Sequence, residues 1–563
     1  MNLRELFLAA LLCSALSIET AAQLSVDTQA IDAIFKEYDR TDGPGCALGI
    51  ISEGQLVYAR GYGMANMEHD VPLAKDTVLR IGSTSKQFTA ACAVLAEQQG
   101  KLSLDADIRE YLPEMPDYGV PVTTRHLLHH TSGIRDYLTL MSLGGNGDED
   151  YYSDEQAFQM IARQRSLNFP TGTQHLYSNS GYFLVSVIIK RATGQSLREF
   201  AEEHIFAPLK MTNSHFHDDA NHIVKNRADG HMRAQSGEWK ISNTTLEMCG
   251  DGGVFTTVED MQRWDANFYD PVVGGQAFVD ALQTHGKLND GTELTYSLGL
   301  TVDQYRGLPM VSHGGAFVGF RAETIRFPEQ KLSVVCFANM ARINPSGLAM
   351  QVADIVLKEQ FPTDSAPSPT SQPGAAVKVS APIVDLPGQQ LERFAGRYLD
   401  QASGNVVDVS VAHNGLLLGL NNQSLTLRPN SPTEFSDAET GTSLRFEPAS
   451  MDGFWKGLAR VGRDTLVLGP YIPWDAGFMS LDDYTGVFFS PELNVKWTFN
   501  VKANELIADD VEGESLPLSP IALDAFGSPF GILIFKRNAF NEIEGYELNA
   551  GRVQGLQFER SGR

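Results

Sequence analysis

Cysteine is scarce in this chain of 563 residues. Five are present, and no two of them form a C-x-x-C pair. So few cysteines in so long a chain exclude a disulfide-based scaffold. Cys46 and Cys336 lie in apolar stretches that are typical of strands, and we therefore expect buried free thiols.

Long apolar runs are equally rare. Residues 6–18 form a run of about 13 residues, which is too short to cross a bilayer because a spanning helix needs about 20. The run follows Arg4 and precedes the small residues Thr20-Ala21-Ala22, which predicts a secretory signal peptide over residues 1–22. We therefore expect a periplasmic or secreted protein without a stable membrane span.

Basic residues are outnumbered by acidic ones. The chain has 44 Lys and Arg against 69 Asp and Glu, a formal net charge of −25. Non-specific nucleic-acid binding needs a basic face, so a nucleic-acid partner is not expected. Hydrophobic residues make up 42% and charged residues 20%, a balance that excludes a largely disordered chain.

A proline-rich segment divides the chain. Residues 362–388 contain six prolines among Ser, Thr and Ala, which predicts a linker. Before it, periodic apolar positions predict helices over 84–99 and 182–192, and the run 332–337 predicts a buried strand. We expect residues 23–361 to form one α/β (α+β) domain.

The segment after the linker has short strand-like runs separated by Asn, Gly and Pro turns. The octapeptide 391–398 recurs 90 positions later at 481–488, with the same order of apolar, acidic, aromatic and glycine residues. This weak repeat predicts two antiparallel β-barrels, over 389–478 and 479–563. Two unrelated strand starts are the alternative.

The strongest chemical signal is Ser83-Thr84-Ser85-Lys86. Ser83 and Lys86 are three residues apart at a predicted helix start, so their side chains share one face. A serine hydroxyl becomes a nucleophile when a base removes its proton, and a desolvated lysine of lowered pKa is such a base. A helix-capping serine is the bland alternative.

Two further elements follow in order. The first is Tyr177-Ser178-Asn179, on a loop before the second helix: Tyr177 could pass a proton between Ser83 and the leaving group, and Asn179 could orient Lys86 or bind a substrate amide. The second is 312–316, just before a strand-like run. There His313 precedes a glycine pair, Gly315 would let a substrate backbone approach a strand edge, and Ala316 would offer an oxyanion-hole N–H together with Ser83.

These three elements resemble the penicillin-recognising serine hydrolases, the fold family of β-lactamases and penicillin-binding proteins. The third element has histidine where many members of the family have lysine, and in this it resembles the class C and D-aminopeptidase-like branch. Segment 394–398 resembles the lipocalin-like barrels attached to D-aminopeptidases of this family. The resemblance implies an antiparallel sheet flanked by helices and an acyl-enzyme on Ser83. It further implies an acid–base pair of Lys86 and Tyr177, supporting roles for Asn179, His313 and Ala316, and homo-oligomers.

His313 bears on the substrate. A lysine at this position is a permanent cation suited to a substrate carboxylate, whereas histidine is mostly neutral at pH 7. The neutral histidine favours aminopeptidase, amidase or esterase chemistry, and the resemblance to the D-aminopeptidase-like branch implies D-stereospecific action on small peptides, amides or esters. The alternatives are a β-lactamase or DD-carboxypeptidase and, in another class, a catalytically vestigial scaffold that binds a cell-wall polymer or a protein.

Two other polar features have competing interpretations. His126, His129 and His130 lack the metalloprotease H-E-x-x-H arrangement, and neither a metal nor any other cofactor is expected. Asp251 precedes Gly252-Gly253, where aspartate is a common turn former; if it lined the cleft, it would attract a substrate ammonium group.

Overall fold

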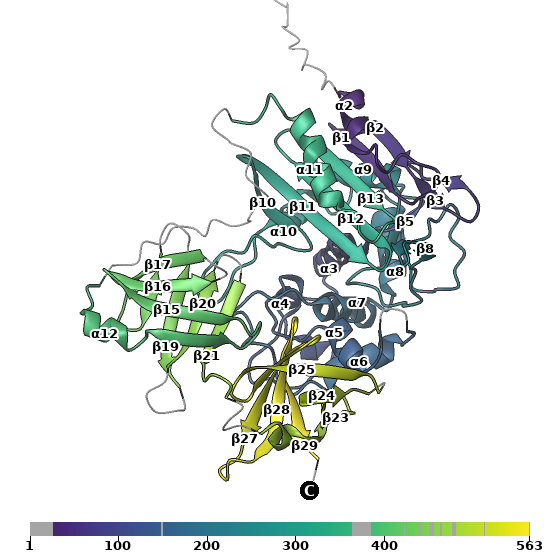
Figure 1. The fold of residues 1–563 in the computed structure, drawn as a ribbon. Coiled ribbons are helices and arrows are strands. Elements are labelled where there is room, and N and C mark those ends of the chain that lie inside the picture. The colour runs from purple at the N-terminus through teal and green to yellow at the C-terminus, as the bar shows by residue number, and fades with distance from the viewer. Residues whose placement is uncertain are drawn as a thin grey trace, which may run out of the picture.

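The computed structural model describes residues 26–147, 150–362 and 384–561, apart from short gaps at 421–422, 438–441, 450–454, 462–463, 476–479 and 512. The predicted signal peptide and most of the proline-rich segment lie outside these residues. A sheet-and-helix region is followed by two β-barrels (Figure 1). Among the helices described, none is long and apolar enough to cross a membrane.

The first region is built on a six-stranded antiparallel sheet in the order β10-β11-β12-β13-β1-β2. Its strands are β1 (Cys46–Ser52), β2 (Gln55–Tyr62), β10 (Thr301–Tyr305), β11 (Leu308–Phe317), β12 (Phe320–Phe327) and β13 (Leu332–Ala338). β13, the strand predicted over 332–337, is buried at every position. It pairs with β1 in a register that places Cys46 opposite Ala338, so the two ends of the region close one sheet.

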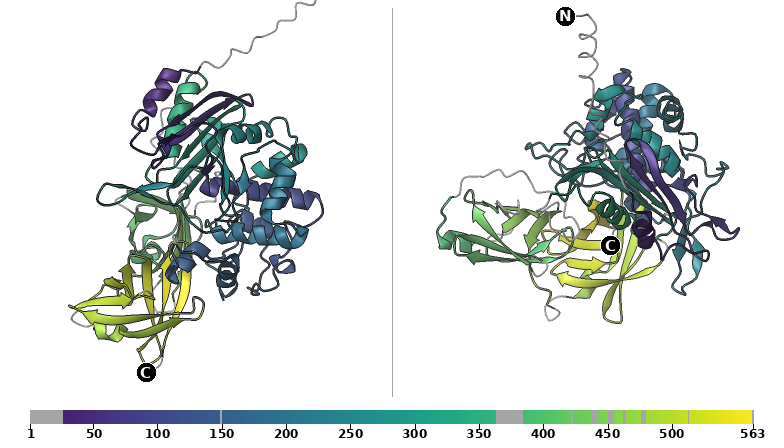
Figure 2. Two further views of the ribbon diagram at one scale, coloured as in Figure 1. Left: turned by 90° about the vertical axis from the view of Figure 1, so that its right-hand side faces the viewer. Right: turned by 90° about the horizontal axis from the view of Figure 1, so that it is seen from above.

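Helices cover both faces of this sheet (Figure 2). On one face, α2 (Thr28–Ile34) and α11 (Pro345–Val356) pack against apolar side chains of β1, β12 and β13. On the other face lies α9 (Val258–Ala266), followed by a helical lobe. The lobe contains α3 (Lys86–Gln98), α4 (Thr124–Leu128), α5 (Tyr137–Leu143), α6 (Asp154–Ala162), α7 (Asn179–Thr193), α8 (Leu197–Ala201) and α10 (Gly275–Gln283).

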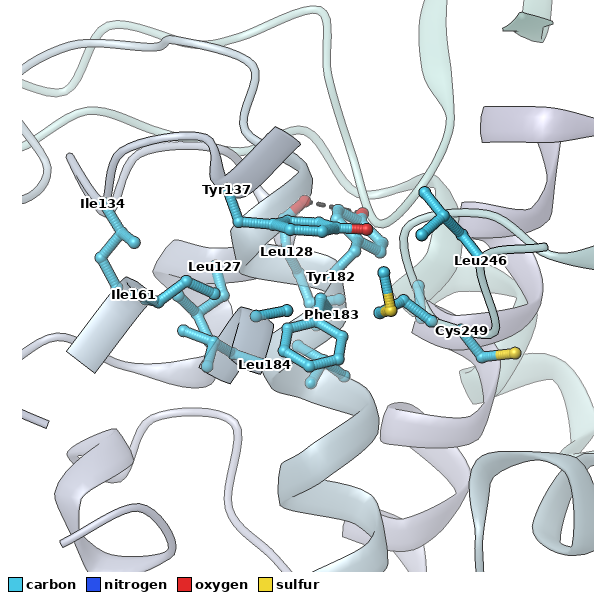
Figure 3. Close-up of a cluster of buried hydrophobic side chains, with 14 of the residues drawn as sticks. Leu127, Leu128, Ile134, Tyr137, Ile161, Tyr182, Phe183, Leu184, Leu246 and Cys249 are labelled. Atoms are coloured by element: carbon cyan, nitrogen blue, oxygen red, sulfur yellow. Dashed lines mark hydrogen bonds between the residues drawn. The ribbon is translucent and has the colours of Figure 1, made fainter. Parts of the chain in front are cut away.

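The core of the lobe is centred on α7. Phe183 and Leu184 of this helix are fully buried, and Leu127, Ile161 and Tyr137 lie around them (Figure 3). α7 begins three residues before the predicted helix and ends at Gly194, whose φ of +80° is a left-handed conformation that glycine adopts without strain. The four described cysteines are buried and unpaired, as predicted.

Short strands complete this region. They are β3 (Met64–Asn66), β4 (Val71–Pro72), β5 (Leu79–Arg80), β6 (His215–Phe216), β7 (His231–Arg233), β8 (Trp239–Ile241) and β9 (Val254–Thr256). β5, β9 and β6 form a small sheet. β5 leads directly into the turn 82–85, so this sheet anchors the chain immediately before Ser83.

The remaining chain forms two closed eight-stranded antiparallel barrels, which confirms the predicted fold class. The first comprises β14 (Gly396–Asp400), β15 (Val406–Ala412), β16 (Gly415–Leu420), β17 (Gln423–Pro429), β18 (Glu434–Ser436), β19 (Ser443–Pro448), β20 (Trp455–Val461) and β21 (Asp464–Pro470). The second comprises β22 (Gly486–Ser490), β23 (Val495–Lys502), β24 (Glu505–Asp509), β25 (Ser515–Ala522), β26 (Ala525–Ser528), β27 (Gly531–Arg537), β28 (Ile543–Ala550) and β29 (Val553–Arg560).

The sequence repeat falls at the same place in both barrels. Each copy begins within a short helix and continues into the first strand of a barrel. The first copy runs from α12 (Gly388–Glu392) into β14, and the second runs from a 3₁₀ turn over 481–484 into β22. The repeat has two aromatic positions, Phe394 and Tyr398 in the first copy and Tyr484 and Phe488 in the second, and all four side chains are buried. The repeat therefore marks equivalent strand starts.

Candidate active site

Ser83 stands in a 3₁₀ turn, Gly82–Ser85, immediately before α3. The turn is pressed against β11, because a Cβ at Gly82 would lie 2.9 Å from the backbone nitrogen of Ala316. A Cβ at Gly315 would lie 2.0 Å from the carbonyl oxygen of Ile81. Glycine at both positions lets the backbone of β11 approach the predicted nucleophile.

Lys86 is the first residue of α3 and is fully buried. Its Nζ donates to Ser83 Oγ at 3.1 Å, to Asn179 Oδ1 at 2.9 Å and to the backbone carbonyl of Asp251. Burial lowers the pKa of Lys86, whereas the carboxylate of Asp251 raises it. The neutral amine is thereby made accessible near neutral pH, and it contacts the hydroxyl from which it would take a proton.

Tyr177 packs over the same lysine. Lys86 Nζ lies 4.8 Å from the centre of the Tyr177 ring, and the ring of His130 lies 4.2 Å from it on centroids. The Tyr177 hydroxyl is buried and has no hydrogen-bond partner among the described residues. Burial raises the pKa of Tyr177, so this side chain is a neutral hydroxyl at pH 7.

Asn179 begins α7, and its position is set by Asp136. The Asp136 carboxylate accepts the backbone N–H of Asn179 at 2.7 Å and also that of Thr139 at 3.2 Å, which caps α5. The N–H of Ser178 is bound in turn by His130 Nδ1 at 3.2 Å. Two residues outside the predicted motifs, His130 and Asp136, therefore hold the Tyr177-Ser178-Asn179 loop.

The third motif lies within β11 rather than before a strand. β11 runs from Leu308 to Phe317: β10 pairs with residues 308–312 on one side, and β12 pairs with residues 311–317, including both glycines, on the other. Thr84 Oγ1 donates to the carbonyl of His313 at 3.1 Å, which ties the strand to the nucleophile turn.

His313 is buried, and its ring is engaged inside the fold. Its Nδ1 lies 2.6 Å from the carbonyl of Gly314 and its Nε2 lies 2.9 Å from Tyr296 Oη. These partners assign a neutral ring that donates from Nδ1 and accepts at Nε2. Burial lowers the pKa of His313 to about 4, so the third motif carries no cation at pH 7.

A pocket of about 860 Å³ joins these groups. Of the residues predicted for the site, all except Lys86 line it, and Lys86 lies beneath its floor. The predicted site residues at the wall of the pocket are Ser83, Tyr177, Asn179, His313, Gly315 and Ala316. The three motifs, which span more than 230 positions of sequence, thus meet at one cavity.

The second barrel also lines this pocket. Arg552, between β28 and β29, places its guanidinium 4.7 Å from the centre of the Tyr177 ring and 3.7 Å from Asp136 Oδ2. Phe530 and Ala550 of the same barrel are also at the pocket wall. Nothing in the motif spacing indicated this contribution, because it depends on how the barrel docks.

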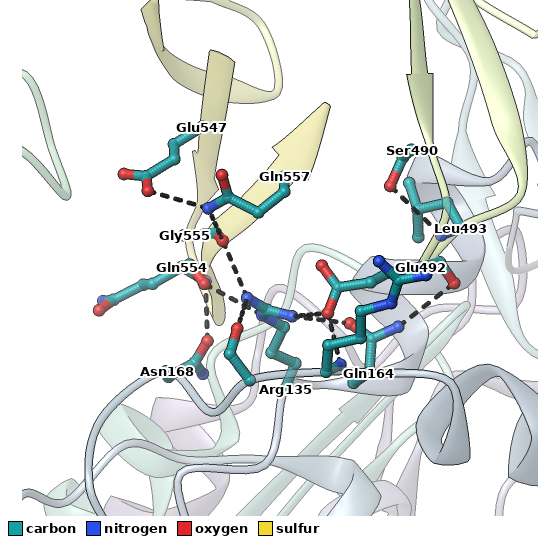
Figure 4. Close-up of polar contacts among 12 residues, drawn as sticks. Arg135, Gln164, Asn168, Ser490, Glu492, Leu493, Glu547, Gln554, Gly555 and Gln557 are labelled. Atoms are coloured by element: carbon teal, nitrogen blue, oxygen red, sulfur yellow. Dashed lines mark hydrogen bonds and ion pairs between the residues drawn. The ribbon is translucent and has the colours of Figure 1, made fainter. Parts of the chain in front are cut away.

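The docking contact is centred on Arg135, whose side chain is fully buried (Figure 4). Arg135 pairs with Glu492 at 2.8 Å and donates to the backbone carbonyls of Gln554 and Gly555, both at 3.0 Å. Asn168 makes two further hydrogen bonds to the β28–β29 hairpin. Because Arg135 and Asp136 are consecutive, the docked barrel is connected directly to the residue that holds Asn179.

Two of the three histidines weighed as metal ligands contact other side chains. His126 Nδ1 bonds Thr123 in a helix cap, and His130 packs on Tyr177. In the part of the chain that the structure describes, no three His, Cys, Asp or Glu side chains are arranged to hold a metal ion.

Comparison with known proteins identifies relatives for most of the chain. The beta-lactamase family model matches residues 31–355. A D-aminopeptidase of Cereibacter sphaeroides is 29% identical over 396 residues, covering 69% of this chain and 71% of the relative. A D-aminopeptidase of Gluconobacter oxydans is 28% identical over 379 residues, covering 66% and 70%.

Solved structures share the fold. An octameric penicillin-binding protein homologue from Pyrococcus abyssi superposes with a TM-score of 0.53 at 21% identity, covering 86% of this chain and 98% of that one. The D-amino acid amidase from Ochrobactrum anthropi SV3 superposes with a TM-score of 0.50 at 21% identity, covering 59% and 99%.

Proposed function

Since the chain belongs to the beta-lactamase family, we propose that it is a serine hydrolase that forms an acyl-enzyme on Ser83 and acts on D-aminoacyl amides and short peptides. The observation that carries this proposal is the contact between the buried Lys86 amine and the Ser83 hydroxyl. The D-aminopeptidases that match about two thirds of the chain support the substrate class.

The reaction follows from the positions of three groups. Neutral Lys86 accepts the Ser83 proton as Ser83 Oγ attacks the substrate carbonyl, and the tetrahedral oxyanion is bound by backbone N–H groups, for which we propose Ser83 and Ala316. The proton then passes through Tyr177 to the leaving amine, and the C–N bond breaks. Water attacks the resulting ester, with Lys86 as its base, and releases the acid.

The third motif bears on substrate choice. His313 is neutral and bonded on both ring nitrogens, so it offers no charge to a substrate carboxylate. β-Lactams and the C-terminal D-residues of carboxypeptidase substrates carry such a carboxylate next to the reacting amide. The neutral imidazole therefore favours amides that lack a neighbouring carboxylate over these two substrate classes.

We further propose that residues 1–22 are a secretory signal peptide and that the two barrels extend over 389–478 and 479–563. We propose a periplasmic or secreted enzyme in which the second barrel forms part of the substrate pocket. We also propose that the protein forms a homo-oligomer, because the penicillin-binding protein homologue from Pyrococcus abyssi, which covers 86% of this chain, is octameric.

Hydrolysis of D- and L-alanine p-nitroanilide by the wild type and by Ser83→Ala tests the function. We expect the D-isomer to be preferred, and turnover to fall by about 10³-fold or more in the variant, since loss of the nucleophile removes the covalent pathway. Intact mass should show an acyl adduct in the wild type and in the matched control Ser85→Ala. Full turnover by Ser83→Ala would refute the proposal, and an absent adduct would favour a vestigial scaffold.

A further inference from the structure

We propose that the Asp251 carboxylate binds the α-ammonium group of the substrate and thereby selects acyl groups that carry a free amine. This inference rests on the proposed function, because it assigns a residue to the acyl group that Ser83 would accept. It concerns a position in the turn before β9, outside the three motifs.

Asp251 touches the catalytic groups through its own backbone. Its carbonyl oxygen accepts a hydrogen bond from Lys86 Nζ, and the residue lines the pocket beside Ser83. Its Oδ2 accepts the hydroxyl of Tyr137 at 3.1 Å, which fixes the side chain. In an α-aminoacyl substrate the ammonium group is bonded to the carbon next to the reacting carbonyl, so its partner must lie close to the nucleophile and base, as Asp251 does.

Asp251 has no cation in direct contact with its carboxylate among the described residues, although burial raises its pKa to about 6 and Lys86 and Arg80 interact with it at longer range. The residue is 8% exposed, yet its carboxylate forms no ion pair within the described part of the chain. Other buried carboxylates have a cation: Glu492 pairs with Arg135, and Asp265 pairs with Arg326 at 2.7 Å. A buried charge without a partner is costly, and a ligand cation would remove that cost.

Two other buried carboxyl groups differ from Asp251 in their partners and position. Glu323 and Asp400 form no ion pair either, but both are satisfied within the fold. Glu323 is bonded by the Ser346 hydroxyl and by the N–H of Thr324, and Asp400 is bonded by N–H and hydroxyl groups of its own turn. Neither lines the pocket, whereas Asp251 does, and among the described residues Tyr137 is the one side chain that donates a hydrogen bond to its carboxylate.

Asp136, the other acidic residue at the pocket, is already occupied. It accepts the backbone N–H groups of Asn179 and Thr139 and faces the guanidinium of Arg552. A substrate ammonium group would have to displace these partners, and loss of the bond to Asn179 would disturb the group that holds Lys86. Asp251, which has neither a cation in contact nor a bond to Asn179 among the residues that the structure describes, is therefore the carboxylate at the pocket that can accept an ammonium group without disturbing the site.

Binding of a cation at Asp251 would also act on the base. The Asp251 carboxylate raises the pKa of Lys86 and thus favours its protonated form, which cannot accept a proton. A substrate ammonium group next to Asp251 offsets this negative charge and shifts Lys86 toward the neutral amine. An aminoacyl substrate would thereby favour the neutral form of the base that activates Ser83.

The test compares two substrates that differ only in the amine. D-Alanine p-nitroanilide and propionyl p-nitroanilide share the acyl length and leaving group, and kcat/KM is measured for both with the wild type and with Asp251→Asn. The asparagine keeps the shape and an acceptor for Tyr137 but removes the charge. We expect the alanyl-to-propionyl ratio of kcat/KM to fall by roughly 10- to 100-fold, the value of a charge-assisted hydrogen bond. The effect of the lost charge on the pKa of Lys86 acts on both substrates and cancels in this ratio.

Glu323→Gln is the matched control, since it neutralises a buried carboxyl that does not line the pocket; the ratio of the two kcat/KM values should stay at its wild-type value. An equal fall for both substrates in Asp251→Asn, or a wild type that prefers the propionyl substrate, would overturn the inference. Failure of the proposed function looks different: the wild type would form no acyl adduct on Ser83 with either anilide.

Discussion

The two barrels share a fold and a sequence repeat, but they are joined to the rest of the molecule in different ways. The first barrel has a core of its own, centred on Phe394 and Phe446, separate from the core of the first region. Its polar contact with that region is made by Arg460, which pairs with Asp290 at 3.2 Å and donates to the carbonyl of Thr173. Both charged partners are partly exposed, so the contact is weak.

The second barrel shares its core with the helical lobe. Buried residues such as Tyr484 and Phe488 belong to the same apolar cluster as α3 and α7. The buried Arg135–Glu492 pair fastens it, and Arg552 reaches the pocket. Two barrels of the same fold can therefore differ in role because they dock differently. The first barrel makes a weak contact with the sheet-and-helix region, whereas the second forms part of the wall of the candidate active site.

Breaking the buried Arg135–Glu492 ion pair should have the largest effect on stability and should distinguish the second barrel from the first. In Glu492→Ala, Arg135 keeps its charge but loses its partner in a dry interface, and we expect a loss of about 3–5 kcal/mol in the free energy of unfolding. Urea denaturation measures the loss. The matched change on the first barrel, Glu434→Ala, removes an exposed partner of Arg445 and should cost less than about 1 kcal/mol. Equal losses would remove the contrast between the barrels.

Removing the guanidinium from the pocket should have a smaller effect, which acts on catalysis. Arg552 lowers the pKa of Lys86, so Arg552→Ala raises it and leaves more of the lysine protonated at neutral pH. The acid limb of the kcat/KM profile should then move to higher pH, with a fall of less than about tenfold at pH 7 because Arg552 is the weakest of the charges that act on Lys86. Arg552→Lys retains the charge and should keep the limb in place; a limb that is unmoved in Arg552→Ala would show that the second barrel does not influence the base.

The smallest effect is expected at the contact of the first barrel. Arg460→Ala removes a partly exposed ion pair and should lower the free energy of unfolding by roughly 0.2–1 kcal/mol, with kcat/KM unchanged. Thermal denaturation and the alanyl anilide assay measure the two quantities. A clear loss of activity would place the first barrel in the functional unit as well.

Local patterns were sufficient for much of this architecture. Apolar periodicity and glycine stops predicted α3 and α7, the run 332–337 predicted β13, and the octapeptide repeat located the first strand of each barrel. Ser83, Lys86 and Tyr177 could be named because helix geometry places residues three positions apart on one face, and because the order of the three motifs resembles a known family. The third motif was placed just before a strand, since two glycines interrupt the apolar pattern, yet pairing of residues 311–317 with β12 makes it part of β11.

Contacts between segments far apart in the sequence could not be predicted and are seen only in the tertiary structure. Arg552 reaches the pocket because Arg135 finds Glu492, a partner 357 positions away, and no periodicity records such a pairing. The same holds for Asp136 beneath Asn179, and for Asp251, whose sequence context allowed both a turn former and a cleft residue. Side-chain pattern and spacing determine which elements form and which groups can act. The docking of elements determines the burial, and burial lowers the pKa values of Lys86 and His313, on which the proposed chemistry depends.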